Sequence, residues 1–135
     1  MAFNRPIAAT TIFCEASGEP SEARRGVAHV IVNRANRPLR FGATVAAVCL
    51  RRMQFSEWND DALDNRNLER AALADDDDPI MLDCLAAFDE AVAGGTDVTG
   101  GATHYHDDSI QPPDWTVGAV RTCKLGRLIF YRGVA

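Results

Sequence analysis

The sequence lacks the features that mark several large classes of protein. Lys124 is its only lysine, and the net charge is −5. Nucleic-acid-binding proteins usually carry a basic face, so this acidic balance counts against that class. No apolar run approaches the roughly 18–20 residues of a membrane span. With 47% hydrophobic and 24% charged residues, the 135-residue chain has the composition of one globular domain, which we expect to span residues 1–135.

Other signatures are also missing. The first thirteen residues lack the apolar segment and small-residue cleavage site of a secretory signal, so we expect synthesis in the cytoplasm without stable membrane association. There is no P-loop, dinucleotide fingerprint or nucleophile elbow. The four cysteines form no C-x-x-C pair, which disfavours zinc fingers and thioredoxin-like sites. Buried thiols are expected, with disulfides formed after export as the alternative. Cys14 as a nucleophile is a further alternative, but apolar neighbours favour an inert thiol.

The apolar pattern predicts four helices. They cover residues 6–16, residues 21 to about 33–37, residues 44–53, and a segment that begins at Pro79 and stops at Gly94. Residues 54–67 are polar enough to be mostly loop. Short aromatic and β-branched runs at 103–106 and 128–131 suit antiparallel strands. We therefore predict an α+β fold, rich in helix, with a small antiparallel sheet.

The acidic run Asp75–Asp78 lies directly before Pro79. Carboxylates are favourable at the positive end of a helix, and proline is common at the first helical position. A calcium site is the alternative, but the run lacks the alternating spacing of a calcium loop. We expect helix capping.

Glu15 is the first candidate for chemistry. It lies at the end of an apolar segment, just before the permissive Gly18. A carboxyl half-buried there would have its pKa raised by desolvation into the range of a general acid. Glu19 follows four residues later, but Gly18 and Pro20 interrupt the helix, so we do not assume that both carboxylates share a face. From spacing alone, a cap or ion-pair role for Glu15 is the alternative.

A second candidate group surrounds His104 and His106, which point the same way on a strand. They could ligate a metal with Asp107 or Asp108, but no third ligand stands at a fixed spacing, and we expect neither metal nor cofactor. The alternative is a polar, aromatic wall of a substrate groove. Trp115, held by the preceding prolines, suits either sugar stacking or a core anchor.

Six segments together resemble a known family, the SleB/CwlJ-type cell-wall hydrolases, which include the catalytic domains of spore-cortex lytic enzymes. They are, in order, Glu15-Ala16-x-Gly18-Glu19-Pro20, Val27-Ala28-x-Val30-Ile31-Val32-Asn33-Arg34, Gln54-Phe55-Ser56, Gly101-Ala102-Thr103-His104-Tyr105, Pro112-Pro113-x-Trp115 and Gly126-x-x-x-Phe130-Tyr131. Each segment is weak alone, but six in the right order are specific.

The resemblance implies a lysozyme-like fold and cleavage of the β-1,4 bond after N-acetylmuramic acid in peptidoglycan. Glu15 would be the catalytic acid of a lytic transglycosylase, which closes a 1,6-anhydro ring. One carboxylate can serve both steps, which fits a sequence with no obvious second acid. The expected substrate-binding residues are Ser17, Gln54, Phe55, Thr103, His104, Tyr105 and Trp115.

Two positions depart from the family pattern. Ser17 stands where relatives often carry Arg, and Leu128 stands where they often carry His. Neither change touches the expected acid, but both bear on substrate preference. Lysozyme-type hydrolysis, a non-catalytic peptidoglycan-binding module with a groove of Tyr105 and Trp115, and a metal-dependent hydrolase are the alternatives.

A bare catalytic domain of this size looks like a phage or prophage endolysin. Such an enzyme accumulates in the cytoplasm and reaches the cell wall, in the periplasm, through a holin. Its partner would be the peptidoglycan glycan strand, and a monomer is the default expectation.

Overall fold

The computed structural model describes residues 4–50, 71–75 and 77–135. Its helices are α1 (Asn4–Ala16), α2 (Ser21–Ala35), α3 (Pro38–Phe41), α4 (Val45–Leu50) and α6 (Pro79–Val92). Its strands are β1 (His104–Asp107), β2 (Val120–Leu125) and β3 (Leu128–Arg132), with a short 3-10 helix, η2 (Asp114–Thr116), between β1 and β2. The predicted loop at 54–67 and the predicted end of the third helix at 51–53 lie outside the described residues.

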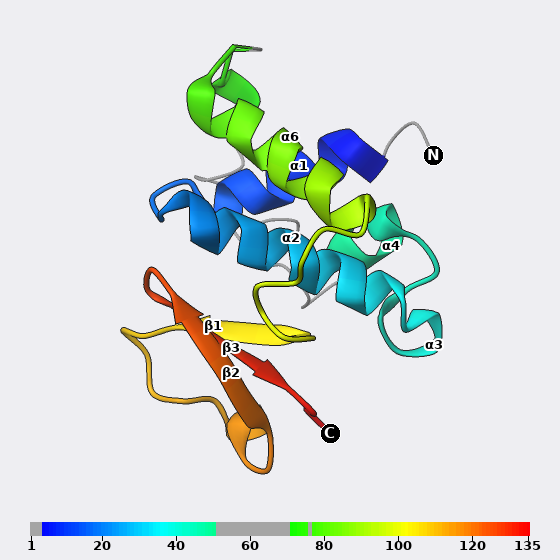
Figure 1. Ribbon diagram of the computed structural model, residues 1–135, viewed down its shortest axis with the longest axis vertical. Coiled ribbons are helices and arrows are strands. Elements are labelled where there is room, and N and C mark those ends of the chain that lie inside the picture. Colours follow the sequence, from blue (N-terminus) through cyan, green and yellow to red (C-terminus); the bar gives the residue numbers. More distant parts are fainter. Residues whose placement is uncertain (1–3, 51–70, 76) are drawn as a thin grey trace.

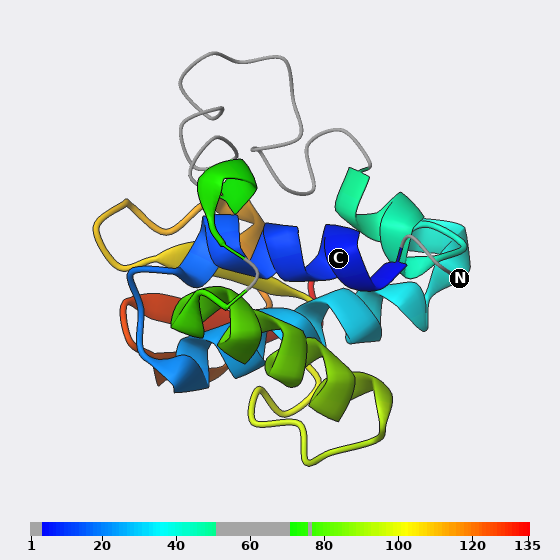
Figure 2. The ribbon, with the colours of Figure 1, turned by 90° about the horizontal axis from the view of Figure 1, so that it is seen from above.

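α2 is the centre of the helical layer. Ala23, Val27, Val30 and Ile31, the stripe that the sequence predicted, are completely buried. α1 and α6 pack against α2 and against each other, and Figure 2 shows them side by side. The sheet lies on the other side of α2 from α6 (Figure 1). The core therefore extends across both faces of α2.

The sheet has the order β1-β3-β2, with both pairs antiparallel. The chain thus places its last strand in the middle. In the register, Tyr105 pairs with Phe130, and Asp107 pairs with Leu128. Sequence analysis predicted β1 and β3 but not β2. The helix-rich α+β fold with a small antiparallel sheet is confirmed.

The acidic run caps α6 as predicted. The side chain of Asp78 accepts hydrogen bonds from the backbone N–H groups of Ile80 at 2.9 Å and Met81 at 3.1 Å. These are N–H groups that the first turn of a helix leaves without an intrahelical partner. Among the residues that the structure describes, which leave out Asp76 of this run, no group of three or more potential ligands could hold a metal ion.

The start of β1 is fastened to the C-terminal turns of α2. Asn33 donates from Nδ2 to Asp97 Oδ2 at 2.9 Å and to the carbonyl of Ala102 at 2.8 Å. Arg34 donates from Nε to the carbonyl of Thr103 at 2.6 Å. Because these bonds join residues about seventy apart in the chain, they fix where the sheet begins relative to the helices.

Burial of the cysteines follows the prediction for most of them. Cys14, Cys49 and Cys84 are buried, whereas Cys123 is partly exposed. Burial raises the pKa of the Cys84 thiol to about 12, which makes it chemically inert as a nucleophile. None of the helices that the structure describes is long and apolar enough to cross a membrane.

Candidate active site

A cavity of about 210 Å³ opens where the end of α1 meets the sheet. It is lined mainly by polar residues from three parts of the chain: Cys14, Glu15, Ser17, Gly18, Glu19, Asp107, Arg127 and Leu128. Two of the residues singled out from the sequence, Glu15 and Ser17, therefore lie in one cavity. Leu128 lies there too, so both departures from the family pattern border the same space.

Glu15 reaches this cavity because α1 ends beside it. The residues on either side, Cys14 and Ala16, are buried in the core, while Glu15 itself is half-buried. The helical hydrogen bonding continues one residue past α1, because the N–H of Ser17 donates to the carbonyl of Phe13 at 2.9 Å. A half-buried carboxyl at the last turn of a buried helix thus lines the cavity.

A buried arginine lies near Glu15. Arg34 is only 6% exposed, and burial lowers its pKa, while the neighbouring Tyr105 and Glu15 act in the opposite direction. A positive charge near a carboxyl group stabilises its ionised form. The sequence placed Arg34 in a family motif but assigned it no role.

Glu19 lines the same cavity but has a different environment. Its side chain is 7% exposed, and its two oxygens face Arg127. Oε1 accepts from the backbone N–H of Arg127 at 2.7 Å, and Oε2 accepts from its Nε at 3.1 Å and pairs with its Nη2 at 3.0 Å. Both oxygens of this carboxylate are therefore engaged.

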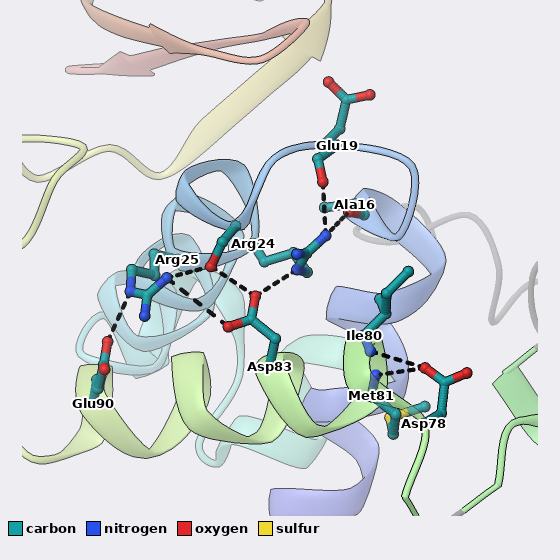
Figure 3. A network of polar contacts seen from close by, with 10 residues as sticks. Ala16, Glu19, Arg24, Arg25, Asp78, Ile80, Met81, Asp83 and Glu90 are labelled. Carbon is teal, nitrogen blue, oxygen red and sulfur yellow. Dashed lines mark hydrogen bonds and ion pairs between the residues drawn. The ribbon is translucent and has the colours of Figure 1, made fainter.

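The backbone between the two carboxylates is held from the helical side. Arg24 donates from Nη1 to the carbonyl of Glu19 at 2.7 Å and to that of Ala16 at 3.3 Å (Figure 3). Its Nε meets Oδ2 of Asp83 on α6 at 2.6 Å. This ion pair and the hydrogen bond from Ser21 outweigh burial and lower the pKa of Asp83.

Asp107 is a third carboxylate of the cavity, which sequence analysis considered only as a metal ligand. Its Oδ1 accepts from the backbone N–H of Ser109 at 2.8 Å. Hydrogen bonds with the side chain and the backbone of Ser109, aided by the charge of Arg127, lower the pKa of Asp107. At neutral pH the carboxyl of Asp107 is ionised. Whether Asp107 acts beside Glu15 in the reaction is a question for the proposed function.

The predicted aromatic residues lie on two faces of the sheet. His104 and His106 point the same way, as predicted, and both rings contact Trp115, at 5.1 Å and 5.9 Å between centroids. Tyr105 points to the opposite face and packs on Phe130 at 5.5 Å. The structure therefore does not join Tyr105 and Trp115 in one groove.

Among the described members of this group, only Tyr105 shares a face with the cavity, because Asp107 lies two residues further along the same strand. Thr103 is buried, with Oγ1 at 2.9 Å from Nδ1 of His104. Trp115 is half-buried and contacts Tyr131 edge-on at 5.2 Å, as a core anchor would. Gln54 and Phe55 lie outside the described residues.

The two histidines are committed to other contacts. His106 is buried, with Nδ1 at 2.8 Å from the carbonyl of Asp107 and Nε2 at 3.0 Å from the hydroxyl of Tyr131. Burial, together with the charges of Arg34 and Arg40, lowers the pKa of His104 to about 4. A metal would have to displace the Tyr131 hydroxyl to reach Nε2 of His106, and neither histidine lines the cavity that contains Cys14.

Comparison with known proteins agrees with this architecture. Residues 18–131 match the sequence model of the cell wall hydrolase family. The catalytic domain of the SleB protein of Bacillus cereus is similar, with a TM-score of 0.75 and 23% identity, over 98% of this chain and 91% of that one. The catalytic domain of the germination-specific lytic transglycosylase SleB of Bacillus anthracis gives a TM-score of 0.72 and 24% identity, over 96% and 93%.

No curated protein sequence matches this one. The two structural likenesses concern the fold, since the identities are low. The family match is a match of sequence. It runs through α2, α6 and all three strands, and ends at Tyr131 in β3. The chain belongs to the cell wall hydrolase family.

Proposed function

We propose that the protein degrades peptidoglycan by cleaving the β-1,4 bond between N-acetylmuramic acid and N-acetylglucosamine, with Glu15 as its acid and base. The observation that carries this proposal is the position of Glu15, half-buried at the end of α1 in a polar cavity between helices and sheet. Membership of the cell wall hydrolase family supports the substrate class.

The mechanism that we propose is lytic transglycosylation. Protonated Glu15 gives its proton to the glycosidic oxygen, and the bond between that oxygen and C1 of the muramic sugar breaks. The carboxylate then takes the proton of the C6 hydroxyl, whose oxygen bonds to C1 and closes the 1,6-anhydro ring. No water is consumed, and Glu15 ends protonated, as it began. Glu19 fits no second catalytic role, since Arg127 engages both of its oxygens.

Hydrolysis is the second candidate reaction, and the presence of the Asp107 carboxylate in the cavity favours it. An ionised carboxylate in the cavity of Glu15 could stabilise the positive charge that develops at C1 or activate a water molecule. Hydrolysis would add water to the cleaved bond and leave a reducing muramic end. The two candidates therefore differ in their products, and in whether Asp107 is needed.

The test uses isolated sacculi and the Glu15→Gln variant. The amide cannot supply the proton, so we expect release of soluble fragments to stop while circular dichroism and thermal unfolding stay those of the parent protein. Full activity of Glu15→Gln would overturn the assignment. Binding of sacculi by the parent protein without any released product would instead favour a non-catalytic binding module.

Mass spectrometry of the products then separates the two reactions. Transglycosylation gives anhydromuramic ends, each lighter by one water than the reducing ends left by hydrolysis. We expect anhydro products from the parent protein and from Asp107→Asn alike. Reducing ends, lost in Asp107→Asn, would establish hydrolysis with Asp107 as the second carboxylate.

An endolysin role in host-cell lysis stays a prediction. It is supported only by the proposed substrate. When the protein is produced inside a host bacterium, co-expression of a holin should trigger rapid lysis, whereas the Glu15→Gln variant should not lyse the cells. Lysis that is unchanged by Glu15→Gln would contradict this role.

A further inference from the structure

The segment 16–20, which follows Glu15, bridges the two halves of the molecule. Glu19 and Ser17 of this segment line the cavity together with Glu15. On its helical side, the two backbone carbonyls bonded to Arg24 tie the segment to α2, and through Asp83 to α6 (Figure 3). The path of the backbone after Glu15 is therefore fixed by a partly buried arginine, whose side chain is 11% exposed.

On its other side, the segment is joined to the turn between β2 and β3. The carboxylate of Glu19 holds both the backbone and the side chain of Arg127, which is 108 residues away in the chain. A bond to the backbone N–H fixes the turn itself, not only a flexible side chain. The two side chains of this ion pair differ in their exposure to solvent: that of Arg127 is 65% exposed, whereas that of Glu19 is 7% exposed.

The neighbouring glycine shows how closely the turn approaches. Gly126 has a φ of +58°, and a Cβ at this position would lie 2.6 Å from Oε1 of Glu19 and 2.8 Å from Cδ of Pro20. Such distances are not tolerated between a Cβ and another heavy atom. The turn is thus packed directly on the segment after Glu15, and only glycine allows the contact.

The residues that line the cavity come from two parts of the fold, which we call its two walls. The first wall includes Glu15 and Ser17, at and just after the end of α1, and the second includes Arg127, Leu128 and Asp107 of the sheet and its turn. Glu19 is the residue that bonds across from the first wall to the second. A sugar bound between the walls meets Glu15 at a distance that this bridge sets.

We propose that Glu19 is a positioning residue for Glu15, holding the β2–β3 turn at the distance that places the scissile bond against the acid. The proposal rests on the proposed function, since it takes Glu15 as the acid. Catalysis is sensitive to such placement, because a misplacement of about 1 Å can cost about a hundredfold in rate. Substrate affinity, which is spread over many contacts, is less sensitive.

The test compares Glu19→Gln with Glu90→Gln. Glu90 on α6 also pairs with an arginine, with Oε2 at 2.9 Å from Nε of Arg25 (Figure 3). Neither residue of this pair lines the cavity. With soluble glycan chains as substrate, we expect Glu19→Gln to lower kcat by about ten- to a hundredfold and to change KM by less than about threefold. Glu90→Gln should leave both unchanged.

Variants of Arg127 form the second part of the test. Arg127→Ala removes an exposed side chain but keeps the backbone N–H, so the protein should stay folded even if Glu19→Gln does not. If the pair acts as one unit, the double variant should lose little more kcat than the worse single variant. Arg127→Lys, which retains the charge, should recover part of the loss.

Two results would overturn the positioning role. One is unchanged kcat in a folded Glu19→Gln or in Arg127→Ala. The other is a double variant whose losses multiply, as expected for two independent contacts with substrate. The outcome for Glu15→Gln separates this failure from that of the proposed function. An inactive Glu15→Gln beside a fully active Glu19→Gln overturns positioning alone, whereas an active Glu15→Gln overturns the proposed function.

Discussion

At the scale of single residues, the carboxyl groups of the site differ from one another because their surroundings differ. Glu15 and Glu19 are four residues apart and line one cavity, yet only Glu19 has both oxygens bound by Arg127. Asp107, a third carboxyl of the cavity, is kept ionised by Ser109. Sequence alone named Glu15 from a motif. It could not assign a role to Glu19, because the partner of Glu19, Arg127, lies 108 residues away in the chain.

His104 gives a pH-dependent prediction at this scale. Its pKa is about 4 in the folded protein and 6.5 in an unfolded chain. Between these values the unfolded state binds a proton that the folded state does not, so the free energy of unfolding should decrease as pH falls from 6.5 towards 4. His104→Phe, which keeps an aromatic ring between Phe41 and Trp115, should make this decrease smaller.

Urea unfolding at pH 7 and pH 5 measures the effect. The quantity to compare is the change in midpoint between the two pH values, for the parent protein and for His104→Phe. Carboxyl groups that titrate below pH 5 contribute equally to both proteins, so the difference isolates His104. Equal changes in both proteins would show that His104 is protonated in the folded state as readily as in the unfolded one.

At the scale of elements, the long helices were predictable, whereas the short elements α3, η2 and β2 were missed. α2 and α6 have apolar stripes that repeat with the helical period, and the structure starts them at Ser21 and Pro79, as predicted. α1 begins at Asn4, two residues earlier than expected. α3 has only four residues, too few for any period to show.

β2 was missed for a different reason. Val120, Arg121 and Lys124 are exposed on this edge strand, so its residues do not alternate between a buried and a solvent face. β2 pairs with β3, and the register of this pair is irregular between Arg121 and Cys123. Only the neighbouring strand, which sequence analysis did predict, makes this polar segment a strand. The aromatic residues of β1 were assigned correctly to a strand, but which face meets the cavity depends on packing against α2.

Gly26 provides the prediction for the contact between α2 and the sheet. Alanine is the better helix former, by about 1 kcal/mol. A Cβ on Gly26 would however lie 2.6 Å from Cζ of Phe130 and 2.9 Å from Cδ1 of Leu125. Phe130 is completely buried and cannot move away. We expect Gly26→Ala to destabilise the protein by about 1–3 kcal/mol, since overpacking outweighs the gain in propensity.

Thermal or urea unfolding of Gly26→Ala tests this expectation. Gly18→Ala is the control, because a Cβ there meets no atom within 4 Å. Its stability should match that of the parent protein or exceed it slightly. An increase in stability for Gly26→Ala would mean that the helix and the sheet separate more easily than the packing of Phe130 implies.

At the scale of the whole molecule, charge sets how the protein meets its proposed substrate. The net charge is −5, and the peptides and polymers of bacterial walls carry many carboxylates and phosphates. Like charges oppose encounter, and salt screens this repulsion. We therefore expect the initial rate of sacculus digestion to rise when sodium chloride is raised from low concentration to about 0.15 M.

Initial rates on sacculi and on short glycan fragments, made uncharged by amidation of their muramic carboxyl groups, separate this effect from changes in the enzyme. The rate on uncharged fragments should not depend on salt. A rate on sacculi that falls with added salt would indicate local attraction, for which the exposed arginines of the sheet, such as Arg121 and Arg132, are the candidates.

The position of β3 between β1 and β2 also has a consequence for synthesis. A ribosome releases β1 and β2 before β3, so neither has its hydrogen-bonded neighbour while the chain is still growing. The turn with Arg127 acquires its fixed place only when β3 follows it out. Helix α1 can form early, but the nascent protein has one wall of its cavity and not the other. The cavity around Glu15 is therefore complete only after the last strand has emerged, and the proposed activity requires that strand.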